Sequence, residues 1–476
     1  MKKIILLLFI SQTAIAENFV LSESSLSKLS DDVPTMQQIE LLSDSAKLGY
    51  LGMNDAFTPS LTASAYYSEN KEKQLNRFAP ITSPIKDFSV GVEKPTSIGM
   101  KLGAKVFAQQ TTNSFVTSST TTGISAELAM DLHKDFLGRI TKTELDNRKM
   151  EADKADLEKK ISKKAFIQNL RKLYWALVAN NEAQKITKEL LVTANQQVKQ
   201  AEDRFKNKVA DSGEVARYRS QVAARTASLI SLQYQQSNLH QRLKEMIPSL
   251  ASKTIVLAPY NLDETVNNVL VCSSMLEQKT NSPMDFTLYD EVVQILNGQE
   301  QNQKKIDNLY DTWDLALQSE IKKTGKEYTY SESYSDLSSD GRNAYQVGLQ
   351  LTIPLGSRKK DTREVKEIVN KKKFKAEQEA NLAKLEAYHS QMIRSVTLLK
   401  QVVANQKINS FNLAKSLKVS QKKYKQARIT VEQLVQEQDG FLNSNLAEIE
   451  TKLNIINTLL DYFSVYTETP CNLNRI

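Results

Sequence analysis

Two long stretches of the chain lack the residues that normally end helices. No proline occurs in residues 139–247 or 357–469, and each stretch has a single glycine, Gly213 and Gly440. Proline and glycine are the strongest helix breakers, so both stretches should be almost wholly helical. Each is expected to fold back once near its middle, which predicts two helical hairpins.

The two helical stretches belong to a duplicated unit in which an alternating strand leads into a long helix. The first copy has a strand at 124–132 and a helix over 139–205, and the second has a strand at 347–355 and a helix over 358–424. The number of residues that separates the two helix starts, 139 and 358, is therefore the same as the number that separates the two helix ends, 205 and 424. Matched spacing over this distance indicates an internal repeat.

The helices show the apolar spacing of coiled coils. Such seams pack against neighbouring helices, and the clearest example alternates steps of three and four: Leu446, Ile449, Leu453, Ile456, Leu460 and Phe463. A continuous helix over 139–205 would be roughly 100 Å long at 1.5 Å per residue. Only 40% of the residues are hydrophobic, which fits long helices sharing a narrow seam better than one thick core.

The strands alternate between apolar and polar residues over about 9–11 residues, the length that crosses a bilayer obliquely. Possible partner strands lie upstream, at 61–67 in the first copy and 313–321 in the second. The first copy also carries an insertion, 68–122, whose alternating segments could join the sheet or stand outside it as a loop. A soluble, half-buried sheet would have the same alternation, so that alternative stays open.

Residues 1–16 have the features of a secretion signal. Lys2 and Lys3 precede an apolar segment at 4–10, and Ala14-Ile15-Ala16 resembles a cleavage site. No later stretch is apolar enough for a transmembrane helix, so any part that spans a membrane is expected to consist of β-strands. The formal charge of +8 is not gathered into a basic, aromatic stripe, so nucleic acid is not an expected partner. No nucleophile–base pair, phosphate-binding loop or metal cluster stands out, so neither an enzyme nor a cofactor is expected.

These features divide the chain into a series of segments. They are a signal peptide at 1–16, a first repeat at 17–250 with its hairpin tip near 208–213, a connector at 251–285, a second repeat at 286–466 with its tip near 427–430, and a C-terminal tail at 467–476. Cys272 lies in the connector and Cys471 in the tail. Export would permit a disulfide between them, and two independent thiols are the alternative.

In this order of elements the chain resembles the outer-membrane efflux protein family, the TolC-type channel-tunnels. The junction Leu349-Gln-Leu-Thr-Ile-Pro-Leu-Gly-Ser-Arg358 looks like the family's strand that ends in Pro-Leu before a Gly-Arg helix start. The resemblance implies a mainly α fold with membrane β-strands. Long coiled-coil hairpins would form a periplasmic tunnel, and a few strands per chain would contribute to a shared trimeric β-barrel. It also implies a homotrimer in the outer membrane that works with a periplasmic adaptor protein and an inner-membrane transporter.

The resemblance extends to the hairpin tips, where the family usually has an aromatic residue, a glycine three positions later and then a hydroxyl residue. Phe205 and Tyr424 match the aromatic residue, whereas Lys208 and Ala427 stand where glycine is usual. The family's adaptor-contacting tips correspond here to Phe205, Lys208, Val209, Tyr424, Ala427, Arg428, Ile429 and Thr430. The residues that constrict the periplasmic aperture would be Glu214, Gln433 and Gln436. For Glu214, an ordinary solvated carboxylate is the alternative.

The sequence therefore predicts a passive exit duct for efflux or type I secretion. Independently of the resemblance, about four membrane strands in one chain would leave unpaired sheet edges in lipid, and three chains would close a barrel of about twelve strands. Two other hypotheses stay open. One is an exported coiled-coil adaptor or scaffold without a pore, and the other is a surface receptor or adhesin that uses 68–122. The cargo, the partner pump and the partner adaptor are not specified by any motif.

Overall fold

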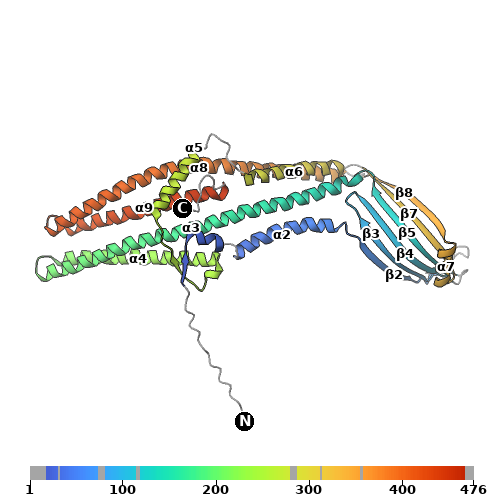
Figure 1. Ribbon diagram of the computed structural model, residues 1–476, viewed down its shortest axis with the longest axis horizontal. Coiled ribbons are helices and arrows are strands. Elements are labelled where there is room, and N and C mark those ends of the chain that lie inside the picture. Colours follow the sequence, from blue (N-terminus) through green and yellow to red (C-terminus); the bar gives the residue numbers. More distant parts are fainter. Residues whose placement is uncertain are drawn as a thin grey trace, which may run out of the picture. The chain divides into compact units, whose positions relative to one another are not determined.

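The computed structural model describes residues 18–29, 33–72, 81–113, 118–278, 287–310, 313–353 and 357–466. The chain divides into two compact units (Figure 1). The first unit holds most of both helical hairpins, including their tips, together with the connector, and comprises Met1–Leu41, Glu158–Leu288 and Asn381–Ile476. The second holds a β-sheet and its flanking helices, and comprises Leu42–Leu157 and Tyr289–Ala380. The predicted signal peptide and Cys471 lie outside the described residues.

Both long stretches without proline form helical hairpins, as the sequence predicts. Helix α3 (Arg139–Lys206) is followed by α4 (Ser212–Met246), and α8 (Ser357–Lys425) is followed by α9 (Val431–Val465). Helices α4 and α9 are each 35 residues long, so the offset between the copies is the same at their starts and at their ends. The internal repeat therefore extends through the second helix of each hairpin without a change in length.

The connector and the two ends of the first repeat contribute short elements to the first unit. Strand β1 (Asn18–Leu21) pairs in parallel with β6 (Thr254–Leu257), while α5 (Leu262–Gln278) packs against α9. Helix α1 (Glu23–Leu29) follows β1 directly, and a 3-10 turn, η2 (Pro248–Leu250), precedes β6. Strands of four residues are too short to show an alternating pattern, so β1 and β6 have no clear signal in the sequence.

The seam predicted on α9 is buried. Four of its six predicted residues are less than a tenth exposed, namely Ile449, Ile456, Leu460 and Phe463. The buried surface is wider than a coiled-coil seam, because Ile455, Leu459 and Tyr462 are buried beside it. Since α9 contacts both α4 and α5, apolar residues are needed on more than one side of this helix.

The second unit contains a six-stranded antiparallel sheet with the order β2-β3-β4-β5-β7-β8. Its strands are β2 (Ser60–Ser68), β3 (Ile85–Pro95), β4 (Met100–Thr111), β5 (Ser119–Asp131), β7 (Asp314–Glu327) and β8 (Arg342–Thr352). Helices α2 (Pro34–Asp55) and α6 (Thr287–Tyr310) precede β2 and β7. Among the described residues, no helix is long and apolar enough to cross a membrane.

The insertion 68–122 joins the sheet. It contributes β3 and β4, which lie between β2 and β5. The pairing suggested by the sequence, between 61–67 and 124–132, is therefore wrong, because two further strands separate them. In the second copy the predicted partners do pair, since Leu317 lies opposite Leu349.

The register gives the sheet one apolar and one polar face. One row across all six strands reads Leu61, Val92, Ala104, Ala126, Ile321 and Tyr345. The neighbouring row, on the opposite face, reads Ser60, Glu93, Gly103, Glu127, Glu320 and Gln346. Large apolar residues on the first face are about half exposed or more, including Val106, Ile124, Ile321, Val347 and Leu349. An apolar surface of this extent requires a partner or a lipid environment.

A short helix, α7 (Tyr330–Ser339), closes one end of the sheet. The Ser333 hydroxyl donates to the Gly325 carbonyl oxygen (2.8 Å) and accepts from the Thr122 amide (3.0 Å), which fixes α7 to β7 and β5. A Cβ atom at Gly325 would lie 2.2 Å from the Ser333 carbonyl oxygen, so only glycine allows this close contact. The sequence does carry a signal for α7, because Thr329 and Glu332 form a capping box at its start.

Candidate functional site

The two hairpin tips have the same backbone geometry. In the first tip, the Val209 amide donates to the Arg204 carbonyl (2.8 Å) and the Lys208 amide donates to the Phe205 carbonyl (3.0 Å). The second tip repeats this pattern, with Arg428 donating to Lys423 (2.9 Å) and Ala427 to Tyr424 (2.9 Å). This pair of bonds is the Schellman motif that ends many helices.

Lys208 and Ala427 occupy the left-handed position of this motif. Their φ angles are 57° and 54°, a region in which residues other than glycine are uncommon. Glycine is the usual residue at this position of the motif, and the family pattern also has glycine here. The turn therefore keeps the conformation that glycine would favour, at a cost of roughly 1–2 kcal/mol for each substituted position.

The helices that leave the tips begin with side-chain caps. The Asp211 carboxylate accepts from the Glu214 amide (2.7 Å) at the start of α4. Thr430 and Gln433 form a capping box at the start of α9, with bonds of 3.2 Å in each direction. Asp211 and Thr430 each stand directly before the first residue of their helix, so the caps belong to the repeat although their residue types differ.

Glu214 links the two tips. Its carboxylate accepts a hydrogen bond from the Tyr424 hydroxyl and pairs with the Arg204 guanidinium at 2.9 Å. The same Arg204 nitrogen lies 2.9 Å from the Tyr424 hydroxyl, and its guanidinium carbon lies 5.4 Å from the Tyr424 ring centroid. The Glu214 side chain is 12% exposed, so it is not the ordinary solvated carboxylate that was the alternative.

A small apolar cluster packs against the Tyr424 ring of this network. It consists of Ala201, Val215, Tyr218 and Val431, with Val198, Tyr424 and Val435 packed against it. The Tyr218 and Tyr424 rings meet edge to face at 6.0 Å. Burial raises the pKa of both tyrosines, and the bond to Glu214 raises the pKa of Tyr424 further. Tyr424 therefore stays protonated at neutral pH and remains able to donate to Glu214.

Polar contacts continue away from the tips between α4 and α9. The Gln221 amide nitrogen donates to the Gln438 oxygen at 2.6 Å, and both side chains are buried. The buried guanidinium of Arg225 pairs with Asp439. Nearer the tip, Arg217 pairs with Glu432 at 3.2 Å, but these side chains are 56% and 61% exposed. Buried polar pairs hold a helix register more strictly than exposed ones, because separating them leaves polar groups unsatisfied.

Most of the other predicted tip residues face solvent. Phe205 is 49% exposed and Val209 is 67% exposed. Ile429 is half-buried, and the remaining exposed positions are Lys208, Ala427, Arg428, Thr430, Gln433 and Gln436. Their predicted roles in adaptor contact and in the aperture stay predictions. Of the two tip aromatics, only Tyr424 takes part in the network around Glu214, a distinction that requires knowledge of which helices pack together.

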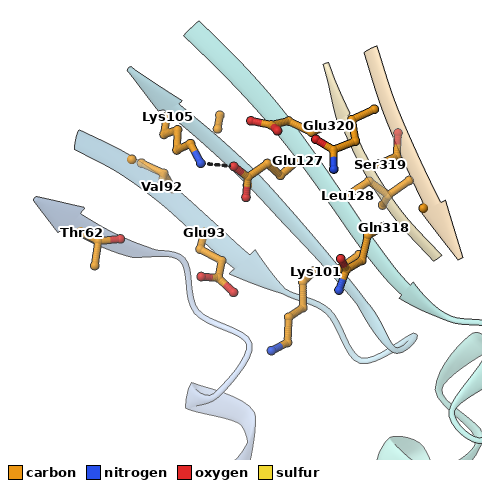
Figure 2. Close-up of a pocket in the computed structure, with 16 residues that line it drawn as sticks. Thr62, Val92, Glu93, Lys101, Lys105, Glu127, Leu128, Gln318, Ser319 and Glu320 are labelled. Atoms are coloured by element: carbon orange, nitrogen blue, oxygen red, sulfur yellow. Dashed lines mark ion pairs between the residues drawn. The ribbon is translucent and has the colours of Figure 1, made fainter. Parts of the chain in front are cut away.

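The polar face of the sheet forms a second notable surface (Figure 2). A hollow of about 460 Å³ lies over it, and the charged residues Glu93, Lys101, Lys105, Glu127 and Glu320 line it. Lys105 on β4 pairs with Glu127 on β5, as the dashed line in Figure 2 marks. The alternating pattern predicted a polar face, but pairing of these charges depends on the register between strands and could not be read from the sequence.

The predicted disulfide involves one described residue. Cys272 lies on α5 and is 4% exposed. Cys471 lies outside the described residues, so a bond between these two cysteines stays a prediction.

Comparison with solved structures identifies the fold. The chain is similar to the outer membrane protein VceC of Vibrio cholerae, with a TM-score of 0.69 and 14% identity over 93% of this chain and 96% of that one. The Campylobacter jejuni outer membrane channel CmeC gives a TM-score of 0.68 at 11% identity, covering 96% of this chain and 91% of that one. The open state of the Neisseria gonorrhoeae outer membrane channel MtrE gives 0.62 at 12% identity, covering 93% and 88%. The sequence matches no family model and no curated protein.

The chain has the TolC-type channel-tunnel fold, which confirms the fold class predicted from the sequence. The match covers nearly the whole length of both chains, so it includes the hairpins, the connector and the strands. At these low identities the likeness establishes the fold alone.

Proposed function

We propose that this protein is a passive outer-membrane exit duct that conducts substrates from the periplasm, or from a linked pump, to the exterior. The observation that carries the proposal is the two-faced sheet attached to long helical hairpins in a channel-tunnel fold. The apolar face suits contact with lipid, and the polar face suits a water-filled interior. The duct itself would catalyse no reaction, so the energy for transport must come from another component, such as a linked pump.

The proposed assembly is a homotrimer. A six-stranded sheet with two open edges is not stable in lipid, because unpaired backbone groups there cost several kcal/mol each. Pairing of the edges between copies would satisfy those groups. Of the solved structures with this fold, CmeC and MtrE are described as outer membrane channels, which supports the same location and role here.

The hairpin tips are proposed as the periplasmic end, where an adaptor protein would dock and an inner-membrane transporter would connect. Exposed tip residues, among them Phe205, Val209 and Arg428, offer apolar and basic contacts for such a partner. The contacts of Glu214 with Arg204 and Tyr424 would hold the tips together in the closed state. Opening would break them and expose the carboxylate of Glu214 beside Gln433 and Gln436 at the aperture.

Negative-stain electron microscopy of the mature protein in detergent tests this function. We expect trimeric cylinders with a long tapering tube and heat-modifiable migration on gels. A monomeric or rod-shaped protein that stays in solution without detergent would reject the duct and favour the coiled-coil scaffold.

A further inference from the structure

The two edge strands of the sheet are suited to pair with each other between copies of the chain. Strand β2 forms one edge and β8 the other, with nine and eleven residues. Among the described residues, no further strand pairs with the outer side of either one. Both are largely exposed over their length. Each edge can therefore accept a strand from a second copy of this chain.

The number of strands makes this pairing antiparallel. Every neighbouring pair within the sheet is antiparallel, and the sheet has an even number of strands. Strand β8 therefore runs opposite to β2, and placing a second sheet beside the first continues the alternation. On both edge strands the odd-numbered residues, such as Ala63 and Val347, lie on the apolar face. A register that matches odd with odd residues keeps that face continuous from copy to copy.

The inserted hairpin is part of the wall of this sheet. Strands β3 and β4 have eleven and twelve residues, long enough to cross a bilayer. Each is paired along its length, and the Lys105–Glu127 ion pair connects the inserted β4 to β5. The apolar row continues through the insertion, from Leu61 across Val92 and Ala104 to Ala126. A loop outside the sheet would not require a continuous register with β2 and β5, or one apolar and one polar face.

We propose that β8 of one copy pairs with β2 of the next, and that the trimer encloses about eighteen strands rather than the roughly twelve predicted from the sequence. This rests on the proposed duct being a trimer, and it adds that six strands of each copy form the wall. With strands about 4.8 Å apart and tilted by about 40°, the backbone diameter would be roughly 35 Å, against roughly 24 Å for twelve strands. The outer end of the duct is then wide, and the narrow point lies elsewhere along it.

Disulfide cross-linking of the edges in the full-length protein tests the pairing. Thr62→Cys on β2 is combined in turn with Ala344→Cys, Gln346→Cys or Gly348→Cys on β8, all on the polar face. Within one copy these strands are five strand spacings apart, roughly 24 Å, far beyond the reach of a disulfide. Only a bond between copies can therefore form.

We expect at least one of these pairs to give a covalent trimer on non-reducing gels. The matched control, Thr62→Cys with Val347→Cys, places the two thiols on opposite faces and should give none. Cross-linking by the control as readily as by the polar-face pairs would contradict the register.

Electron cryo-microscopy of the same protein separates the two proposals. A trimer with eighteen strands supports both. A trimer with twelve strands, and with β3 and β4 outside the wall, would overturn the wide barrel while leaving the duct intact. Failure to form any trimer would reject the duct itself. Polymer exclusion gives a second readout, because an outer entrance with roughly twice the cross-section should admit larger polyethylene glycols from the outside.

Discussion

Removing the Tyr424 hydroxyl should weaken the closed state of the tips. In Tyr424→Phe the ring keeps its contact with Tyr218, while the hydroxyl's hydrogen bonds with Glu214 and Arg204 are lost. Hydrogen bonds to charged groups contribute about 1.5–3 kcal/mol. Arg204 still pairs with the carboxylate in this variant, which places the expected loss at the lower end, about 1.5 kcal/mol per chain.

This loss translates into a measurable change in gating. A change of about 1.4 kcal/mol corresponds to a tenfold change in an equilibrium, so the open-to-closed ratio of each tip should rise roughly tenfold. The effect depends on the bond being present only in the closed state. Single-channel recording in planar bilayers measures it as an increase in open probability or in conductance.

A matched control distinguishes this network from a general loosening of the tips. Arg217→Gln breaks the pair with Glu432, which joins the same two hairpins, but both side chains are more than half exposed. Exposed ion pairs contribute little, so this variant should conduct like the unmodified protein. If Tyr424→Phe also conducts like the unmodified protein, the Glu214 network does not hold the tips closed.

Three further predictions concern other parts of the chain. Ala427→Gly should raise the free energy of unfolding by about 0.5–1 kcal/mol, because glycine relieves the left-handed strain, and a lower midpoint in thermal unfolding would contradict this. Burial of Asp263 would raise its pKa, but the hydrogen bond and charge of Lys452 outweigh this and lower the pKa below its ordinary value of 3.8. The stability from this contact is therefore full above about pH 3.8 and lost as the pH falls further. Asp263→Asn should flatten this pH dependence of the thermal midpoint. Finally, we expect Cys272 and Cys471 to form a disulfide, so equal mobility on reducing and non-reducing gels with both thiols alkylated would reject it.

The helical part of the fold was accessible from the sequence because its signals are local. The scarcity of proline and glycine marked both hairpins, and the spacing of Arg139 and Arg358 identified the repeat. The tips were located within a few residues, since the helices end at Lys206 and Lys425. Local signals of this kind depend on residues close together in the chain, which a single sequence reports directly.

The sheet and the tip network were less accessible because they depend on distant residues. Alternation identified the strands and their faces, but not that β3 and β4 separate β2 from β5. Glu214 was singled out from the family pattern, yet its partner Tyr424 lies 210 residues away. Such contacts follow from the packing of the two hairpins, and no spacing within either hairpin predicts them.

The equal lengths of α4 and α9 place a limit on how the two hairpins can change. One added residue in a helix moves everything beyond it by about 1.5 Å and turns it by about 100°. An insertion in one hairpin would shift its tip along the axis and rotate Glu214 or Tyr424 away from the other. Substitutions are tolerated at the turns, as Lys208 and Ala427 illustrate. The turn residues of each tip can therefore vary at a modest cost, but the lengths of the two hairpins must change together.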